Sequence, residues 1–238
     1  MRAEGHFVLQ IAAGCRYRFG MAEVMRAAMR VSSTPQRELN DTASAILDSL
    51  GDLLMERPIR DVSVADILTE SGFARGTFYL WFDNKFDAVG RAYLRETEGV
   101  GKAGAELFAS GDADLAEATE RVEKVIDELL SAWGQQGHIL RAVHDTWRSE
   151  PSVAKHWAPA FRWVQDSAAQ LIAEVRGRTE VNNLDRVLAS SLINMNDHTL
   201  YQASLGEGFA LDDDVREVLT RAWVFAVFGS DTHRPSRR

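Results

Sequence analysis

The feature that most constrains this chain is the stretch from Val62 to Lys85, in which a tight turn separates two short helical patterns. Ser63 precedes an apolar run and has Asp66 three residues later, an arrangement in which each side chain satisfies a free amide at a helix start. Gly72 then allows the left-handed backbone conformation in which a helix ends and the chain turns sharply. The stretch therefore predicts a helix-turn-helix.

The second helix of this pair is predicted to have a buried side and an exposed side. Phe78 and Phe82 lie four residues apart and are expected to pack inward, which leaves hydrogen-bond donors and flat rings on the wetter faces. In a recognition helix such groups contact phosphates and base edges in the major groove of double-stranded DNA. The residues predicted to bind DNA are Arg75, Gly76, Thr77, Tyr79, Trp81 and Lys85. Lys85 is expected on a phosphate, beside a third helix capped by Asn84.

The residues from Gly72 to Lys85, Gly-Phe-Ala-Arg-Gly-Thr-Phe-Tyr-Leu-Trp-Phe-Asp-Asn-Lys, resemble the signature of TetR-family transcriptional repressors. The resemblance is strong from residue 38 to residue 92. It implies an all-α protein, with a three-helix helix-turn-helix DNA-binding domain followed by a helical ligand-binding and dimerisation domain. In two places the chain departs from the family pattern: Ala74 replaces the usual Ser cap, which costs the helix about 1 kcal/mol, and Phe86 replaces the usual Glu.

The charge of the chain is unevenly distributed along its 238 residues. The net charge is −8, but residues 1–37 hold six Arg and no Lys against two Glu, which gives +4 and leaves −12 for the rest. Affinity for phosphates depends on the face presented, so the acidic total does not exclude DNA binding. The extension is predicted to be either a solvated tail or a basic arm along DNA, formed by Arg16, Arg18, Arg26, Arg30 and Arg37. Met21, Met25 and Met29 are alternative starts.

Cysteine usage and hydropathy favour a cytoplasmic protein with no membrane partner. Cys15 is the only cysteine, so an intramolecular disulfide is impossible, and a reducing compartment fits. No apolar run approaches the roughly eighteen residues of a membrane span. The apolar stretch before Cys15 suggests a lipoprotein signal only weakly, because Gln10 interrupts it.

Helical periodicity continues to the end of the chain, and no strand or hairpin signal interrupts it. The helix that begins at Asn84 is predicted to weaken at Gly99, Gly101 and Gly104, either as a mobile connector or simply as a break. Further helices are predicted at about Leu115–Trp133, His138–Trp147, Pro151–Val175, Leu184–Leu205 and Asp213–Phe228. We therefore predict an extension at 1–37, the DNA-binding domain at 38–92 and the ligand-binding and dimerisation domain at 93–238.

Aromatic residues are concentrated in this second domain, which holds five of the six tryptophans. Any single ring is more readily explained as core, but the whole set favours an apolar cavity with a few polar anchors. Asn194 and Asn196 cannot both face solvent on a largely apolar helix, so one is expected to point inward. The run Leu192–Tyr201 resembles the EthR-type subgroup of the TetR family, which implies that Asn196 is the polar anchor. The ligand-binding residues predicted in this way are Trp133, Trp157, Trp163, Asn196, Tyr201 and Trp223.

The resemblance also implies a homodimer through the last two helices, where Val187, Leu188, Ser191 and Met195 offer a face for close packing. The predicted function is a repressor released from its operator by a small apolar ligand. The alternatives are a helical small-molecule carrier that keeps the first domain as scaffold, and an enzyme that uses the aromatic cavity. No catalytic residue, metal site or cofactor is predicted: the His-Asp neighbours at 144–145 and 197–198 diverge on a helix, and the histidines lack ligand spacing.

Overall fold

The computed structural model describes residues 40–109, 114–206 and 208–229, and within these ranges every regular element is a helix. The all-α prediction is therefore confirmed. Cys15 and the predicted basic arm lie outside the described residues. None of the described helices combines the length and apolarity that crossing a lipid bilayer requires.

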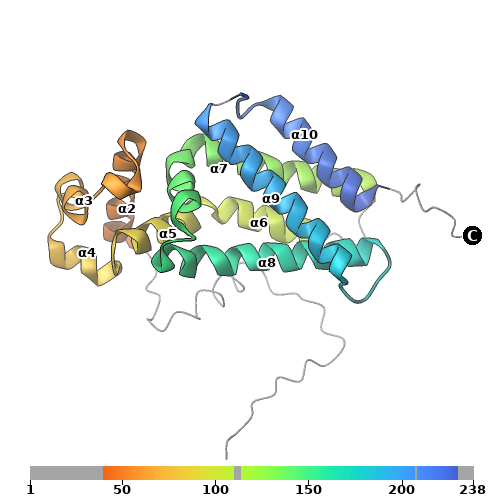
Figure 1. The fold of residues 1–238 in the computed structure, drawn as a ribbon, viewed down its shortest axis with the longest axis horizontal. Coiled ribbons are helices and arrows are strands. Elements are labelled where there is room, and N and C mark those ends of the chain that lie inside the picture. The colour runs from red at the N-terminus through yellow and green to blue at the C-terminus, as the bar shows by residue number, and fades with distance from the viewer. Residues whose placement is uncertain (1–39, 110–113, 207, 230–238) are drawn as a thin grey trace, which may run out of the picture.

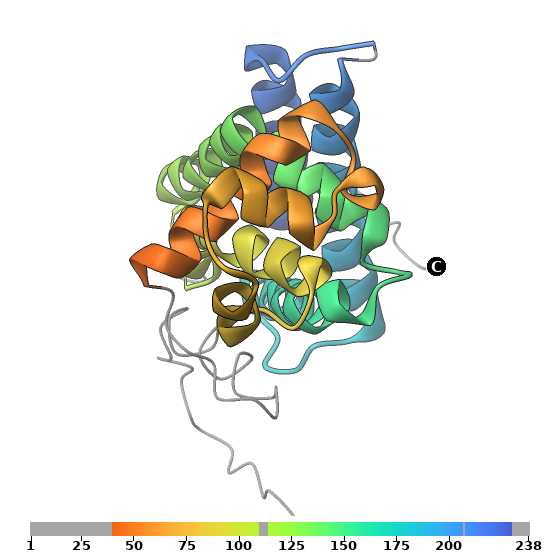
Figure 2. The same cartoon turned by 90° about the vertical axis from the view of Figure 1, so that its left-hand side faces the viewer.

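Three short helices form a head at one end of the elongated molecule (Figures 1 and 2): α2 (Asp41–Glu56), α3 (Val64–Ser71) and α4 (Arg75–Trp81). A short 3-10 turn, η1 (Ile59–Asp61), links α2 to α3. The predicted capping box is present between Ser63 and Asp66, and Gly72 ends α3 with φ 71°. Asn40 caps α2 by accepting from the backbone of Ala43 at 3.0 Å. Local side-chain signals therefore mark the start of α2 and both ends of α3.

The helix α5 (Lys85–Glu96) connects the head to the body and belongs to both. Its buried residues Ala88, Val89 and Ala92 share one apolar core with the head helices and with Ile139 and Val153 of the body. The boundary predicted between residues 92 and 93 falls inside this helix. A displacement of α5 relative to the body therefore also displaces the packed head.

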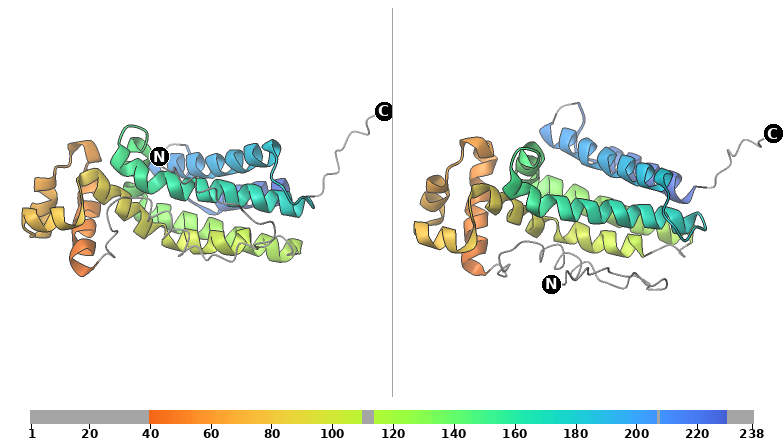
Figure 3. Two further views of the ribbon diagram at one scale, coloured as in Figure 1. Left: turned by 90° about the horizontal axis from the view of Figure 1, so that it is seen from below. Right: turned by 60° about the horizontal axis from the view of Figure 1, so that its bottom comes forward.

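The body consists of helices that run mostly along the long axis of the molecule (Figure 3). They are α6 (Glu98–Phe108), α7 (Leu115–Thr146), α8 (Pro151–Val175), α9 (Asn183–Leu205), α10 (Asp213–Trp223) and the π-helical turn η2 (Val224–Phe228).

The structure modifies two expectations about these helices. The three glycines after α5 do not weaken a helix but lie inside α6, and the chain breaks before them at Thr97. A Cβ on Gly99 would lie 2.4 Å from a carboxylate oxygen of Glu128, so that flexible side chain would have to shift. The helices predicted at Leu115–Trp133 and His138–Trp147 are one helix, α7, with a kink at Gln136 (φ −125°, ψ 24°).

Candidate nucleic-acid interface and ligand cavity

The recognition helix α4 presents hydrogen-bond donors and one aromatic ring to solvent, and its opposite side is packed into the core. Phe78 and Phe82 are fully buried, with ring centroids 5.3 Å apart, as their spacing predicted. Arg75 and Gly76 are exposed, Thr77 is half-buried, and 47% of Tyr79 is exposed. The Arg75 guanidinium lies over the Tyr79 ring, 5.7 Å from its centroid. These four residues form a surface that is free to meet a DNA groove.

Two residues assigned to DNA binding from the sequence have other surroundings. Trp81 was expected on a wet face, but only 9% of it is exposed, because it lies three residues from Phe78 and so shares the buried face. The Lys85 ammonium was expected on a phosphate, but it donates to the carbonyl oxygens of Ile59 (2.8 Å), Arg60 (3.3 Å) and Val62 (2.6 Å). These bonds use its three donors to hold η1 in place.

The two helix starts in this region differ in their capping. Ala74 makes no side-chain hydrogen bond at the start of α4, as its substitution for a hydroxyl residue predicted. Asn84 caps α5 by accepting from the backbones of Phe86 (2.9 Å) and Asp87 (3.0 Å), and its amide donates to Ser152 of α8 at 3.0 Å. The amides that were expected to hold a phosphate are therefore already paired with Asn84.

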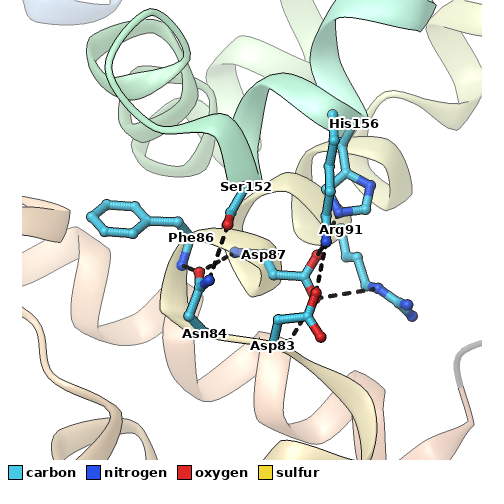
Figure 4. A network of polar contacts seen from close by, with 8 residues as sticks. Asp83, Asn84, Phe86, Asp87, Arg91, Ser152 and His156 are labelled. Atoms are coloured by element: carbon cyan, nitrogen blue, oxygen red, sulfur yellow. Dashed lines mark hydrogen bonds and ion pairs between the residues drawn. The ribbon is translucent and has the colours of Figure 1, made fainter. Parts of the chain in front are cut away.

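A buried polar junction joins α5 to α8 (Figure 4). The Asp87 carboxylate lies 2.6 Å from Nε2 of His156 and 2.8 Å from Nζ of Lys155, and it accepts from the backbone of Asp83 at 3.0 Å. Burial alone would raise the pKa of Asp87, but the bonds from His156, Lys155 and Asp83 outweigh it and hold that pKa well below its usual range. The ring of His156 packs directly on Gly90, where an added Cβ would lie 2.5 Å from it.

The body encloses a cavity of about 160 Å³ between α5, α6, α7, α8, α9 and the end of α10. Its wall is mostly apolar, and it includes five of the six predicted ligand-binding residues: Trp133, Trp157, Trp163, Asn196 and Trp223. A volume of this size accommodates roughly one benzene-sized molecule. A larger ligand must therefore displace part of the wall.

Stacked aromatic rings form the part of the wall nearest the junction. Trp157 lies between Trp147, at 4.1 Å between centroids, and Phe161, at 4.3 Å. All three line the cavity, and Trp157 directly follows His156 of the junction. Phe161 was not among the predicted ligand-binding residues, although its i+4 spacing from Trp157 was a signal that could have found it.

Asn196 is the inward-facing asparagine, whereas Asn194 is exposed. The Asn196 Oδ1 accepts from the indole Nε1 of Trp223 at 3.1 Å, a bond between two buried side chains. Its Nδ2 makes no hydrogen bond to any described residue and belongs to a side chain on the cavity wall. Asn196 thus holds Trp223 in place and keeps a donor for a ligand.

Tyr201 does not line the cavity, so its assignment as a wall residue was wrong. Its hydroxyl donates to Asp145 at 2.9 Å, and its ring stacks on His144 at 3.9 Å between centroids. Tyr201 lies one helical turn after Asp197 on α9. The face of α9 that lines the cavity is formed by Ile193, Asn196, Asp197 and Leu200, and it does not include Tyr201.

Four polar wall residues were not predicted: Tyr93, Thr97, His144 and Asp197. His144 of α7 lies between two carboxylates: its Nδ1 is 3.9 Å from Oδ1 of the neighbouring Asp145, and its Nε2 is 3.5 Å from Oδ2 of Asp197 on α9.

Comparisons with known proteins agree with this architecture. Residues 122–229 match the family model described as the C-terminal domain of the transcriptional regulator EthR. The chain is 27% identical over 195 residues to the HTH-type transcriptional regulator EthR of Mycobacterium tuberculosis, covering 81% of this chain and 89% of that protein. It is 25% identical over 195 residues to the protein of the same name in Mycolicibacterium smegmatis, covering 80% and 88%.

Solved structures share the fold at low sequence identity. A TetR-family transcriptional regulator from Syntrophomonas wolfei superposes with a TM-score of 0.62 at 18% identity, covering 79% of this chain and 95% of that one. The fatty acid degradation regulator FadR from Bacillus halodurans superposes with a TM-score of 0.60 at 15% identity, covering 83% and 100%.

Proposed function

We propose that the chain is a TetR-family transcriptional regulator similar to EthR, and that it acts as a dimeric repressor released from its operator by a small ligand. The observation that carries the proposal is the continuous packing between an exposed recognition helix and a mostly apolar cavity in the body. Arg75, Gly76, Thr77 and Tyr79 would contact the DNA, and the aromatic cavity would hold the ligand.

The junction between α5 and α8 supplies a physical route from cavity to head. A ligand larger than the present cavity must move rings of the wall, among them Trp157. The neighbouring His156 holds Asp87 of α5, which shares its core with the head. A ligand that favours another position of α8 therefore favours another position of the recognition helix, and this differential affinity weakens DNA binding.

The last two helices supply the surface for a second copy of the chain. Leu184 and Val187 of α9, Val218 of α10 and Phe225 of η2 are exposed apolar side chains, and 80% of Phe225 is accessible. Pairing these helices about a two-fold axis would bury this surface. It would also place two recognition helices to read a pseudo-palindromic operator.

The first test is DNA binding by the purified protein. Fluorescence anisotropy with DNA from its own upstream region, at two salt concentrations, is expected to show tight binding that prefers one site over unrelated DNA by about a thousandfold. Equal, salt-labile binding to both DNAs would contradict the repressor proposal and favour the small-molecule carrier.

The Asn196→Ala variant is expected to bind the operator as the wild type does and to respond more weakly to ligand.

A further inference from the structure

The cavity has one polar region, and it is built largely from α9. Ile193, Asn196, Asp197 and Leu200 are spaced i, i+3, i+4 and i+7, so one helix face supplies apolar, amide and carboxylate groups together. His144 completes the region from α7, opposite Asp197. A ligand that enters the apolar part of the cavity therefore meets the Asp197 carboxylate, together with the Asn196 amide group, at this region.

The Asp197 carboxylate is poorly compensated within the protein. Its nearest cationic candidate is the His144 ring at 3.5 Å, and it accepts no hydrogen bond from any described residue. About 36% of the side chain is exposed, so the carboxylate keeps access to a binding partner. Burial, with the charge of Asp197 nearby, raises the pKa of Tyr93, which places that negative charge close to the buried end of α5.

The described wall residues include neither Lys nor Arg. A ligand carboxylate or phosphate would therefore lose its hydration without gaining a cation, and it would be repelled by Asp197. An ammonium group would gain an ionic partner in Asp197 and the faces of the surrounding aromatic rings. The charge of the wall thus discriminates between ligand classes that share the same apolar tail.

We propose that the cavity binds a cationic amphiphile, an alkyl or arylalkyl ammonium compound whose charged nitrogen pairs with Asp197 while its apolar part lies among the tryptophans. This inference rests on the proposed ligand-responsive repressor and specifies its ligand class. It assigns Asp197, rather than Asn196 alone, as the residue that determines specificity.

Three probes with the same tail and different head groups test the proposal: 4-phenylbutylamine, 4-phenylbutanol and 4-phenylbutanoate. Isothermal titration calorimetry of the full chain at about pH 8, where the amine is protonated and the acid ionised, is expected to rank them amine, alcohol, carboxylate. The amine should bind roughly tenfold or more tighter than the carboxylate. In Asp197→Asn the amine should weaken by about the same factor, and the difference between the two charged probes should disappear.

Asp166→Asn is the matched control, because it removes the same charge from an exposed position on α8 that does not line the cavity. Its ranking of the probes should equal that of the wild type. Carboxylate binding as tight as amine binding, or an amine preference that survives in Asp197→Asn, would overturn the inference and leave the repressor intact. If none of the three probes binds, the cavity as a ligand site fails, and the proposed ligand response fails with it.

Discussion

At the scale of single residues, two aromatic side chains of the recognition helix that the sequence assigned to one role, DNA binding, have different surroundings. Tyr79 and Trp81 are both aromatic and only two positions apart, but Tyr79 is half-exposed, whereas Trp81 packs in the head core. A change at the first position therefore acts on binding, and a change at the second acts on stability.

We expect Tyr79→Ala to weaken operator binding about tenfold without lowering the melting temperature, because it removes an exposed contact group. Trp81→Ala should instead lower the free energy of unfolding by about 3–5 kcal/mol, because it leaves a cavity in the core. Anisotropy and thermal unfolding followed by circular dichroism distinguish the two. A stable Trp81→Ala protein that fails to bind DNA would restore Trp81 to the interface.

Asp87 gives the head a characteristic dependence on acid. Its pKa is held below the unfolded value, so its stabilising contribution is complete at neutral pH and is lost as the pH falls through the folded pKa. Urea unfolding should show Asp87→Asn less stable than the wild type by about 3 kcal/mol at pH 7, with the gap shrinking only below about pH 4. A gap that closes near pH 6 would contradict this assignment.

At the scale of elements, the contact between α5 and α8 depends on a missing side chain. Gly90 brings the two helices together by leaving room for the His156 ring. The close packing of these helices thus depends on the absence of a side chain at Gly90 rather than on the fit between two side chains.

Gly90→Ala should therefore destabilise the protein by about 1–3 kcal/mol, because the methyl group pushes His156 away from Asp87. Gly134→Ala is the matched control: it lies in α7 with nothing within 4 Å of the added carbon, and it should stabilise by up to about 1 kcal/mol. Chemical denaturation measures both. Equal effects of the two substitutions would show that the His156 contact is unimportant.

The same junction carries the proposed coupling. In His156→Gln, the ligand, here the neutral 4-phenylbutanol, and the operator should each still bind, but the ligand should reduce operator affinity less than in the wild type. Ser152→Ala, which removes only the bond to the Asn84 amide, is the control. Anisotropy titrations with and without ligand give the coupling, and wild-type coupling in His156→Gln would place the route elsewhere.

At the scale of the whole molecule, the proposed function requires two copies, since one recognition helix reads only a half-site. We expect Val187→Glu to convert the dimer to a monomer and to weaken operator binding, because Val187 is 52% exposed on the face assigned to pairing. Leu115→Glu alters an equally exposed apolar residue at the start of α7 and should leave the dimer unchanged. Analytical ultracentrifugation measures the oligomeric state of both variants. A Val187→Glu protein that is still dimeric would exclude this face as the dimer interface.

The sequence by itself determined the helix-turn-helix, the caps at Ser63 and Asn84, and an aromatic body in which one of Asn194 and Asn196 turns inward. These signals act within one or two turns of helix, so local spacing is sufficient to show them. Only the tertiary structure decided that Lys85 holds η1, that Tyr201 leaves the cavity wall and that His144 meets Asp197. Each of these contacts depends on which helices pack together and on how each helix is rotated about its axis. Local residue spacing does not specify either, because the contacting residues are far apart in the chain.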